Sequence, residues 1–438
     1  MLHRRLKELD AAGTPIRVGM IGCGRMGTGV INQIVRSPGM RTVAVADQAV
    51  DHAVDAVTQS GGGEEVCRAD SVPDASKAIA AGQVAVCTEG RVIPELDVDV
   101  VIDATGMPES GAQTACDAIA AGKHVVTLNV ESDAVIGPIL NRMAGDAGVV
   151  YAVIAGDEPG AVGHLYEWAM TIGLQVHVAG KGSMRPIDWN ADEFTLAEEA
   201  AELKLNPKML ASFRDGSKHC VEMCVVSNGT GLVPDVRGTH ARPARRDEMT
   251  QIMRLKSEGG MLSQSGVVEI TPPVPGPDGK PDLAHSLTPG VYLIVTTDHA
   301  QIHEDFKYLL MGDGPYYLIH RPYHLCAMEV PHSVATAVVR GDPTLSPIGG
   351  PVSEVVSVAK RDLKAGVTIT GSGGPEITGQ IERHEICQAE NLLPLGLSYD
   401  VKLLKDVQKG QALQVDDVAL DEGGMLYQLW RKQQAAFG

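Results

Sequence analysis

The sequence lacks the features of a membrane protein or a nucleic-acid-binding protein. No apolar run approaches the roughly 20 residues that a helix needs to span a bilayer. The charged stretch at residues 1–15 has no apolar core of the kind found in signal peptides. Acidic residues outnumber basic ones, with 55 Asp and Glu and 37 Lys and Arg, which gives a net charge of −18. This negative charge opposes attraction to phosphate backbones and anionic lipids. We therefore expect a cytoplasmic protein that binds neither nucleic acid nor membranes.

The eight cysteines lack the paired spacing of metal ligands, and most lie among apolar residues, so we expect reduced core residues. Cys220 and Cys224 come nearest to a ligand pair, but they have no second pair, and their surroundings are predicted as a strand. The metal requirement stays unknown at this stage, because the acidic side chains that could bind a divalent cation form no dense motif. These residues are Asp157, Glu158, Asp215, Glu222 and Asp235.

The most informative feature that is present is a G-x-G-x-x-G pattern at Gly22, Gly24 and Gly27. It follows an apolar strand at residues 17–21 and precedes an apolar helix face at residues 30–35. The first glycine permits a tight turn, the second lets backbone N–H groups approach a pyrophosphate, and the third lets the helix pack on the strand. The pattern predicts a bound dinucleotide. The residues between the last two glycines, Arg25 and Met26, are expected to contact it.

A carboxylate at the end of the next strand indicates which dinucleotide is bound. The strand at residues 41–46 leads into Asp47, where the carboxylate can hydrogen-bond a ribose 2′-hydroxyl. The same carboxylate would repel the 2′-phosphate of NADP. Arg25 is close enough in sequence to reach that phosphate, so NAD is favoured and NADP stays open.

Strand and helix patterns alternate through residues 1–155, which predicts a Rossmann-type, doubly wound parallel α/β sheet that binds NAD or NADP. Ligands bind outside the carboxyl ends of such strands. The loops that follow the strands at residues 98–104 and 124–130 are therefore expected to meet near the nicotinamide. Their expected cofactor contacts are Ala104, Thr105, Gly106 and Asn129. Asp133 is expected to cap a helix.

An α+β catalytic domain is expected at residues 156–345, with residues 320–345 packing back on the first domain. Its pattern is helix, strand and long Gly- and Pro-rich loops. Lys181 follows a strand at residues 175–179 and lies between two glycines, where its ammonium can donate a proton or a hydrogen bond to a carbonyl oxygen. A surface lysine at a turn is the alternative. A small β-rich domain is expected at residues 346–438.

Two further polar clusters are candidates for the substrate site. His240 and Arg242 belong to the densest basic patch of the chain, which suits a phosphate or a carboxylate, although a solvated loop is the alternative. A second cluster lies at the end of an apolar strand, before a stretch at residues 326–339 that is predicted to be helical. Its members are His320, Arg321, Tyr323 and His324. We expect His240 or His320 to assist Lys181 in catalysis, and the other residues to hold the substrate.

These segments resemble the 1-deoxy-D-xylulose 5-phosphate reductoisomerase-like proteins, which combine a homoserine-dehydrogenase-like nucleotide domain with a C-terminal SAF domain. The similar stretches are residues 102–106, 155–159, 179–182, 230–235, 265–268 and 320–325. The resemblance implies an NADPH-dependent enzyme of isoprenoid biosynthesis that makes 2-C-methyl-D-erythritol 4-phosphate. It also implies that the pocket for the sugar phosphate is lined by Lys181, His240, Arg242, His320, Arg321 and Tyr323.

Two positions depart from that family. Asp47 stands where an NADPH enzyme is expected to carry Ser or Arg, and Ser183 stands where a second basic residue is expected after Lys181. An NAD-dependent dehydrogenase or oxidoisomerase of a sugar acid is therefore an alternative. A homoserine-dehydrogenase-like enzyme is another, although Asn129-Val130-Glu131 replaces the Asn-Lys of that family. A non-catalytic, nucleotide-gated sugar sensor is the least favoured.

The sequence thus predicts an NAD(P)-dependent oxidoreductase that acts on CH–OH groups of a small anionic polyol or a sugar phosphate. Hydride transfer is expected to be coupled to a ketol-type rearrangement. By analogy with other large Rossmann enzymes we expect a homo-oligomer.

Overall fold

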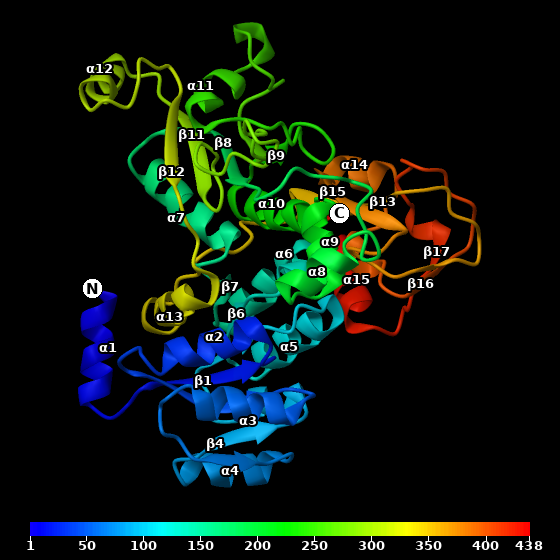
Figure 1. Cartoon of the computed structure of the whole chain (residues 1–438). Coiled ribbons are helices and arrows are strands. Elements are labelled where there is room, and N and C mark those ends of the chain that lie inside the picture. The colour runs from blue at the N-terminus through cyan, green and yellow to red at the C-terminus, as the bar shows by residue number, and fades with distance from the viewer. The chain divides into compact units, whose positions relative to one another are not determined.

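The computed structural model describes residues 1–438 (Figure 1). The chain divides into two compact units. Unit 1 comprises Met1–Gly160, Leu325–Ser346 and Gln428–Gly438, and unit 2 comprises Ala161–His324 and Pro347–Tyr427. The chain crosses between the units after residues 160, 324, 346 and 427. This division differs from the expected three consecutive domains, because residues 346–438 are shared between the two units.

A seven-stranded sheet in the order β3-β4-β2-β1-β5-β6-β7 forms the centre of unit 1. All neighbouring strands are parallel, and the order reverses on either side of β1, which confirms the predicted doubly wound α/β fold. The strands are β1 (Ile16–Ile21), β2 (Met40–Ala46), β3 (Val66–Arg68), β4 (Val84–Cys87), β5 (Val100–Asp103), β6 (His124–Thr127) and β7 (Tyr151–Val153).

The helices of unit 1 come from three parts of the chain. The N-terminal ones are α1 (Leu2–Ala11), α2 (Arg25–Ile34), α3 (Val50–Gln59), α4 (Val72–Ala80), η1 (Gly90–Glu95), α5 (Pro108–Ala120) and α6 (Val130–Ala147). The predicted helical stretch at residues 326–339 forms three short consecutive helices, which are η4 (Cys326–Glu329), α13 (Val330–Ala335) and η5 (Thr336–Arg340). The C-terminal α15 (Met425–Phe437) begins in unit 2 and ends in unit 1.

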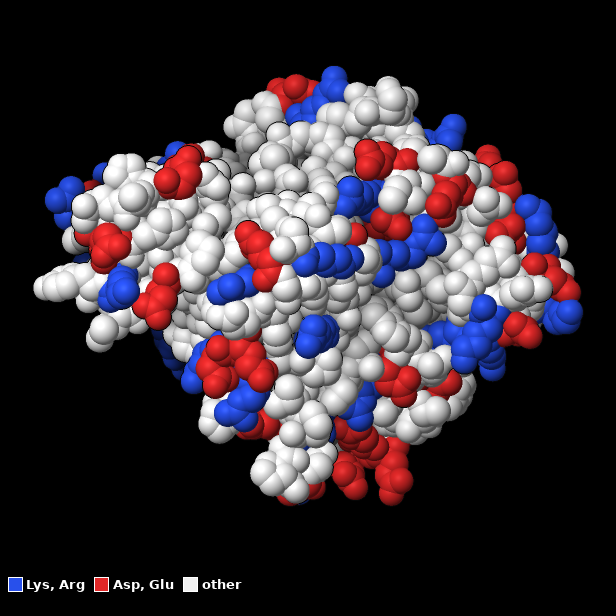
Figure 2. Space-filling model, turned by 90° about the horizontal axis from the view of Figure 1, so that it is seen from above, with Lys and Arg blue, Asp and Glu red and all other residues white.

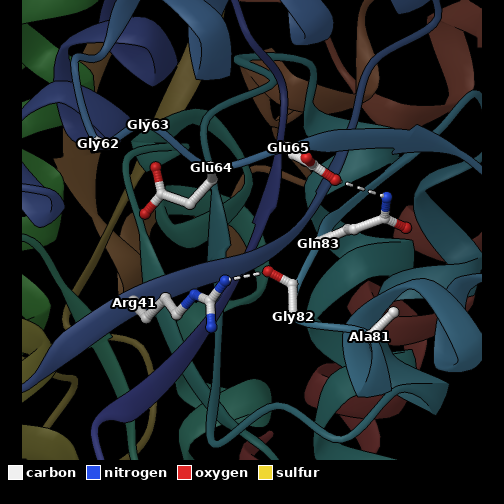
Figure 3. Close-up of a pocket in the computed structure, with 8 residues that line it drawn as sticks. All are labelled: Arg41, Gly62, Gly63, Glu64, Glu65, Ala81, Gly82 and Gln83. Atoms are coloured by element: carbon white, nitrogen blue, oxygen red, sulfur yellow. Dashed lines mark hydrogen bonds between the residues drawn. The ribbon is translucent and has the colours of Figure 1, made fainter.

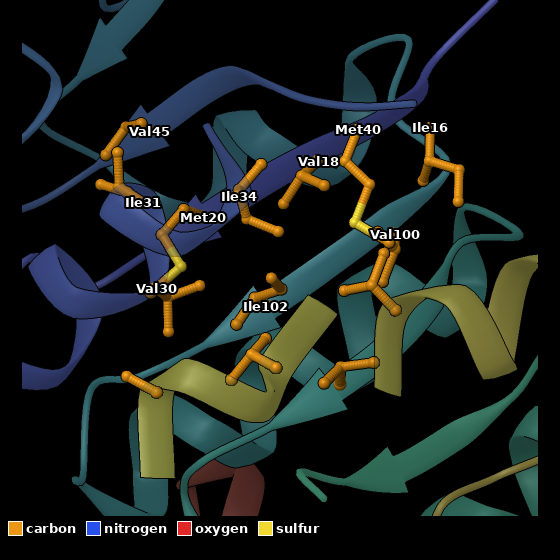
Figure 4. Close-up of a cluster of buried hydrophobic side chains, with 14 of the residues drawn as sticks. Ile16, Val18, Met20, Val30, Ile31, Ile34, Met40, Val45, Val100 and Ile102 are labelled. Atoms are coloured by element: carbon orange, nitrogen blue, oxygen red, sulfur yellow. The ribbon is translucent and has the colours of Figure 1, made fainter. Parts of the chain in front are cut away.

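The core of unit 1 joins residues that are far apart in the sequence (Figure 4). Met20 of β1 is buried with Val30 and Ile34 of α2, so the apolar face of this helix covers the first strand. Val330 and Val334 of α13 belong to the same buried cluster. Residues 325–346 therefore complete this core, because without them part of it would face water.

Unit 2 contains a mixed five-stranded sheet in the order β12-β11-β8-β10-β9. Its strands are β8 (Gln175–Gly182), β9 (Val233–Pro234), β10 (Val267–Thr271), β11 (Val291–Thr296) and β12 (Tyr317–Arg321). The helices before residue 325 are α7 (Glu158–Thr171), which starts in unit 1, α8 (Ala197–Leu203), α9 (Pro207–Arg214), α10 (Ser217–Thr230), η2 (Arg246–Glu248), α11 (Met249–Ile252), η3 (Lys256–Glu258) and α12 (Ala300–Tyr308).

The later part of unit 2 is rich in short strands. It contains β13 (Ser353–Ala359), β14 (Thr368–Ile369), β15 (Ile377–Arg383), α14 (His384–Ala389), η6 (Leu395–Leu397), β16 (Val401–Leu403), η7 (Val415–Asp417) and β17 (Val418–Ala419). β13 pairs with β15, and β16 lies between β14 and β17. Helix α10 packs against β10, β13 and β15.

The strand predicted around Cys220 and Cys224 is wrong, because both residues lie in α10. Every residue of α10 from His219 to Thr230 is buried. A helix that is enclosed on all sides has no solvent-exposed polar face. The 3.6-residue period of polar and apolar residues that marks a helix in a sequence is therefore missing. All eight cysteines are free thiols and five of them are buried, as core residues are expected to be.

None of the helices has both the length and the apolar character needed to cross a membrane. On the face of the molecule in Figure 2, Lys and Arg side chains are interspersed with Asp and Glu side chains.

Candidate active site

The turn between β1 and α2 has the geometry of a dinucleotide-binding loop. Gly22 has a positive φ of 92°. A Cβ atom at Gly27 would lie 1.9 Å from the carbonyl oxygen of Gly22, whereas a Cβ at Gly24 would meet no atom within 4 Å. Gly27 is therefore needed for the close approach of helix and strand, and Gly24 leaves space for a ligand. Arg25 and Met26 are exposed at the first turn of α2, where the helix dipole attracts an anion.

Asp47 lies beside this loop at the end of β2. Its Oδ2 accepts a hydrogen bond from the backbone N–H of Cys23 at 2.6 Å, and its Oδ1 accepts one from Ala49 at 2.8 Å. Because Cys23 is part of the glycine loop, the carboxylate is fixed where the adenosine ribose lies in folds of this type. The residues present therefore fit NAD.

The loops after β5 and β6 are joined by side chains. Thr105 donates to Asp103 Oδ1 from its backbone N–H at 2.9 Å and from its hydroxyl at 2.8 Å. Asn129 Nδ2 donates to Thr105 Oγ1 at 3.1 Å and to the carbonyl of Met107 at 2.9 Å. The carboxyl ends of the two strands are thus tied together. Ala104 and Gly106 lie partly or fully exposed in the same loop, and Ala104 is in contact range of Gly22.

Asn129 is fully buried and caps α6, because its Oδ1 accepts a hydrogen bond from Ser132 N at 3.2 Å. The prediction that Asp133 is the cap is therefore wrong. Asp133 lies within the first turns of α6, is completely buried, and neighbours Tyr151. Burial raises the pKa of Asp133 to about 7.

In unit 2, Lys181 of β8 is a buried residue rather than a surface lysine. It is 1% exposed, and its Nζ forms an ion pair with Oε2 of Glu222, which is also 1% exposed. Glu222 belongs to α10, and His219 Nδ1, one turn earlier on this helix, lies 3.8 Å from the same Oε2. A buried ammonium next to a carboxylate is stabilised in its charged form. The sequence suggested Glu222 only as a metal ligand, because no local pattern pairs positions 181 and 222.

The register of the sheet in unit 2 shows which of the predicted residues share a face. Lys181 pairs with Val291, and Val291 pairs with Arg321, so Lys181 and Arg321 lie on the same face. Gly180 pairs with Tyr292, and Tyr292 pairs with His320. Because neighbouring residues in a strand point to opposite faces, His320 lies on the face opposite to Lys181.

His240 also belongs to that opposite face. Glu269 pairs with Gly180, and its buried Oε1 accepts hydrogen bonds from the backbone N–H of His240 at 2.9 Å and is 3.1 Å from His240 Nδ1. Asp235 Oδ2 lies 3.5 Å from the other ring nitrogen. The hydrogen bond with Glu269 raises the pKa of His240. The sheet thus separates both histidines from Lys181.

The cluster at the end of β12 makes contacts with the loop before β11. His320 Nε2 lies 3.3 Å from the carbonyl oxygen of Leu287, and His324 Nδ1 lies 2.7 Å from that of Pro289. Burial lowers the pKa of His320. The Arg321 guanidinium stacks over the ring of Tyr323 at 4.7 Å. Arg242 lies exposed on its loop.

The acidic residues considered as metal ligands are distributed over both units. In unit 1, Asp157 directly precedes α7 and Glu158 is the first residue of this helix. In unit 2, Asp215 forms an ion pair with Lys360 at 2.7 Å, and Asp235 accepts a hydrogen bond from Ser263 N at 2.9 Å.

Figure 3 shows the residues that line a hollow of about 430 Å³ in unit 1. The hollow is found at the amino ends of β2, β3 and β4, whereas Gly22 and Asp47 follow the carboxyl ends of β1 and β2. Its lining residues are Arg41, Gly62, Gly63, Glu64, Glu65, Ala81, Gly82 and Gln83. This hollow is therefore not the dinucleotide site.

Comparison with known protein families gives two matches. The family described as homoserine dehydrogenase, NAD binding domain, matches residues 22–149. The family described as oxidoreductase DRL, catalytic domain, matches residues 156–330. Both matches end before the SAF-like region expected at residues 346–438. No curated protein matches the chain.

Solved structures of dehydrogenases show a distant likeness. A probable dehydrogenase from Thermotoga maritima is 12% identical over 76% of this chain and 91% of its own, with a TM-score of 0.42. Scyllo-inositol dehydrogenase from Lactobacillus casei, with NAD(H) and scyllo-inositol bound, is 14% identical over 75% of this chain and 88% of its own, with a TM-score of 0.40. Myo-inositol 2-dehydrogenase from Lactobacillus plantarum is 13% identical over 75% of this chain and 91% of its own, with a TM-score of 0.39.

Proposed function

We propose that this chain, an NAD(P)-dependent oxidoreductase, uses NAD and transfers a hydride at a CH–OH carbon of a small anionic polyol derivative. The observation that carries the proposal is the ion pair of Lys181 and Glu222, both 1% exposed. Buried ionisable groups with a specific charge partner are concentrated at functional sites, which supports a chemical role for Lys181.

Lys181 is proposed to act on the oxygen atom of the reacting carbon. Bound nicotinamide supplies or accepts the hydride. In the reducing direction the Lys181 ammonium hydrogen-bonds the carbonyl oxygen, stabilises the negative charge that develops on it, and donates a proton to give the alcohol. In the oxidising direction the neutral amine accepts that proton. Glu222 holds the ammonium in place and favours its charged form.

The preference for NAD follows from Asp47. Its carboxylate is held by two backbone N–H groups at 2.6 and 2.8 Å, so it cannot turn away from a 2′-phosphate without losing them. Two negative charges at this position repel each other, whereas a 2′-hydroxyl can donate to the carboxylate.

The anionic end of the substrate is proposed to bind Arg321, which shares the sheet face of Lys181, together with Arg242 and Tyr323. The resemblance to the reductoisomerase-like proteins makes 1-deoxy-D-xylulose 5-phosphate the first candidate, with reduction coupled to a ketol-type shift. A sugar acid is the second candidate. It is favoured by Ser183, which is buried and donates its hydroxyl to the carbonyl of Arg185 at 2.5 Å, so this position supplies no second cation for a phosphate.

The proposal is tested by titrating the protein with NADH and NADPH and then adding each candidate substrate while following nicotinamide absorbance. Lys181→Met is expected to lower kcat by about 10²- to 10⁴-fold, the range typical of a lost acid–base group. NADH affinity should be unchanged, which serves as the control for folding. A folded Lys181→Met variant with the wild-type rate would refute the assignment.

A further inference from the structure

The later strands of unit 2 carry a buried lysine that is far in sequence from Lys181. Lys360 directly follows β13, and its side chain is 2% exposed. Its Nζ lies 2.7 Å from Asp215 Oδ2 and donates to the carbonyls of Ala191 at 2.6 Å and Gly374 at 2.7 Å. Two donors of the ammonium group thus have carbonyl acceptors, and its charge is paired with the Asp215 carboxylate. The two hydrogen bonds and the buried ion pair fix Lys360 and Asp215 relative to each other.

Asp215 lies directly before α10 and organises its first turn. Its Oδ1 accepts from Ser217 N at 2.9 Å, and its own carbonyl accepts from Thr378 Oγ1 at 2.8 Å. Ser217 Oγ in turn accepts from Gly379 N at 2.7 Å. The start of α10 is therefore held by the ion pair of Asp215 with Lys360 and by hydrogen bonds to β15.

The same helix carries the partner of Lys181. Glu222 lies five residues after Ser217, or about 7.5 Å along the helix axis at the usual rise. Because α10 is buried along its length, it transmits a shift of its first turn rather than absorbing it. A change at Asp215 is thus expected to move the carboxylate of Glu222.

We propose that Lys360 is a positioning residue for Lys181, which acts through Asp215 and α10 to fix the carboxylate of Glu222. This gives the β-rich later part of unit 2 a role in catalysis without contact with the substrate. The consequence for the reaction rests on the proposed function of Lys181, whereas the positioning itself does not.

The first test is the environment of Lys181 in the full-length protein, measured by NMR of ¹⁵N-labelled lysine ammonium groups. The Lys181 resonance is assigned as the one missing from Lys181→Arg. Lys360→Met is expected to shift or broaden it. The matched control is Lys364→Met, since Lys364 is exposed and paired with Asp406 on the surface, and it should leave the resonance unchanged.

The second test is turnover. Lys360→Met is expected to lower kcat by about 10- to 100-fold, the size of effect that a small misplacement of a catalytic group produces, while KM for NADH stays the same. Lys360→Met is also expected to shift the limb of the kcat–pH profile that Lys181→Arg moves, which a general loss of packing would not do. An unshifted Lys181 resonance in a folded Lys360→Met protein overturns the proposal.

If Lys360→Met does not fold, the same two measurements are made on Asp215→Asn, which keeps the shape of the Asp215 side chain and removes its charge. The two proposals fail in different ways. Full activity of Lys181→Met refutes the catalytic role of Lys181, and the NMR comparison still shows whether Lys360 positions it. Loss of activity in Lys181→Met with a normal resonance and a normal kcat in Lys360→Met refutes only the role of Lys360.

Discussion

The proposed preference for NAD rests on one carboxylate, that of Asp47. Replacing it in Asp47→Ser removes the charge and leaves a hydroxyl that can accept from Cys23 N. We expect the ratio of the Kd for NADPH to the Kd for NADH to fall by roughly 10-fold or more, because a charge repulsion near a protein surface is worth about 1.4 kcal/mol or more. Fluorescence titration of both nucleotides measures this ratio.

The matched control is Asp51→Ser. Asp51 is an exposed carboxylate on α3 that pairs with Arg68, so its removal should leave the ratio unchanged. An equal change in both variants would show that net charge, and not the position of Asp47, sets the preference.

The structural features that the sequence predicted correctly are those set by a local pattern. Gly22, Gly24 and Asp47 are recognisable because a short contiguous pattern fixes the turn and the strand that follows it. The pairing of Lys181 with Glu222 could not be predicted, since it depends on how α10 packs on a sheet. The separation of His320 from Lys181 depends on strand register, and a shift of one residue would reverse it.

At the scale of secondary structure, Asn129 connects three segments of unit 1. Asn129→Ala removes the cap of α6 and the two donors to Thr105 and Met107. We expect it to lower the free energy of unfolding by about 2–3 kcal/mol, as the sum of a cap and two hydrogen bonds, and to weaken NADH binding. Urea unfolding and NADH titration measure the two effects.

Asn206→Ala is the control, because Asn206 caps α9 through Met209 N at 3.1 Å in unit 2. Asn206→Ala should lower the free energy of unfolding by about 1 kcal/mol and leave NADH affinity unchanged. Equal losses of stability in the two variants would mean that the bonds to Thr105 and Met107 contribute nothing.

The elements predicted correctly are those that a continuous apolar run or a turn motif marks in the sequence. The parallel strands β1, β2, β5 and β6 were recognised from their apolar runs and from the glycine turns between them. Helix α10 was taken for a strand because burial on all sides removes its periodic polar positions. The sequence suggested that residues 320–345 return to the first domain, whereas the return of residues 428–438 to unit 1 depends on tertiary contacts that no local pattern marks.

The stability of the whole molecule is expected to depend on pH through Asp133. Burial raises its pKa from 3.8 to about 7, so the folded protein keeps a proton that the unfolded chain releases. The stabilisation that this proton provides is fully present below the unfolded pKa and is lost as the pH rises through the folded pKa. Asp133→Asn removes this pH dependence. The free energy of unfolding of Asp133→Asn, relative to that of wild type, should therefore rise by about 2–3 kcal/mol from pH 5 to pH 8.

Urea unfolding of both proteins at these two pH values measures the difference. Asp146→Asn is the control, because Asp146 is exposed on the same helix and should follow the wild-type pH dependence. A constant difference between Asp133→Asn and wild type would show that Asp133 is already ionised in the folded protein at pH 5.

The order in which the two units share the chain has a consequence for synthesis in the cell. Unit 1 takes its last segment from Gln428–Gly438, where Gln433 donates to the carbonyl of Val135 at 2.8 Å and accepts from Ile139 N at 3.1 Å. The nucleotide-binding half is therefore translated first but finished last. A nascent chain that carries residues 1–160 still exposes the surface that α13 and α15 later cover, so it has to remain unaggregated while the whole of unit 2 is being made.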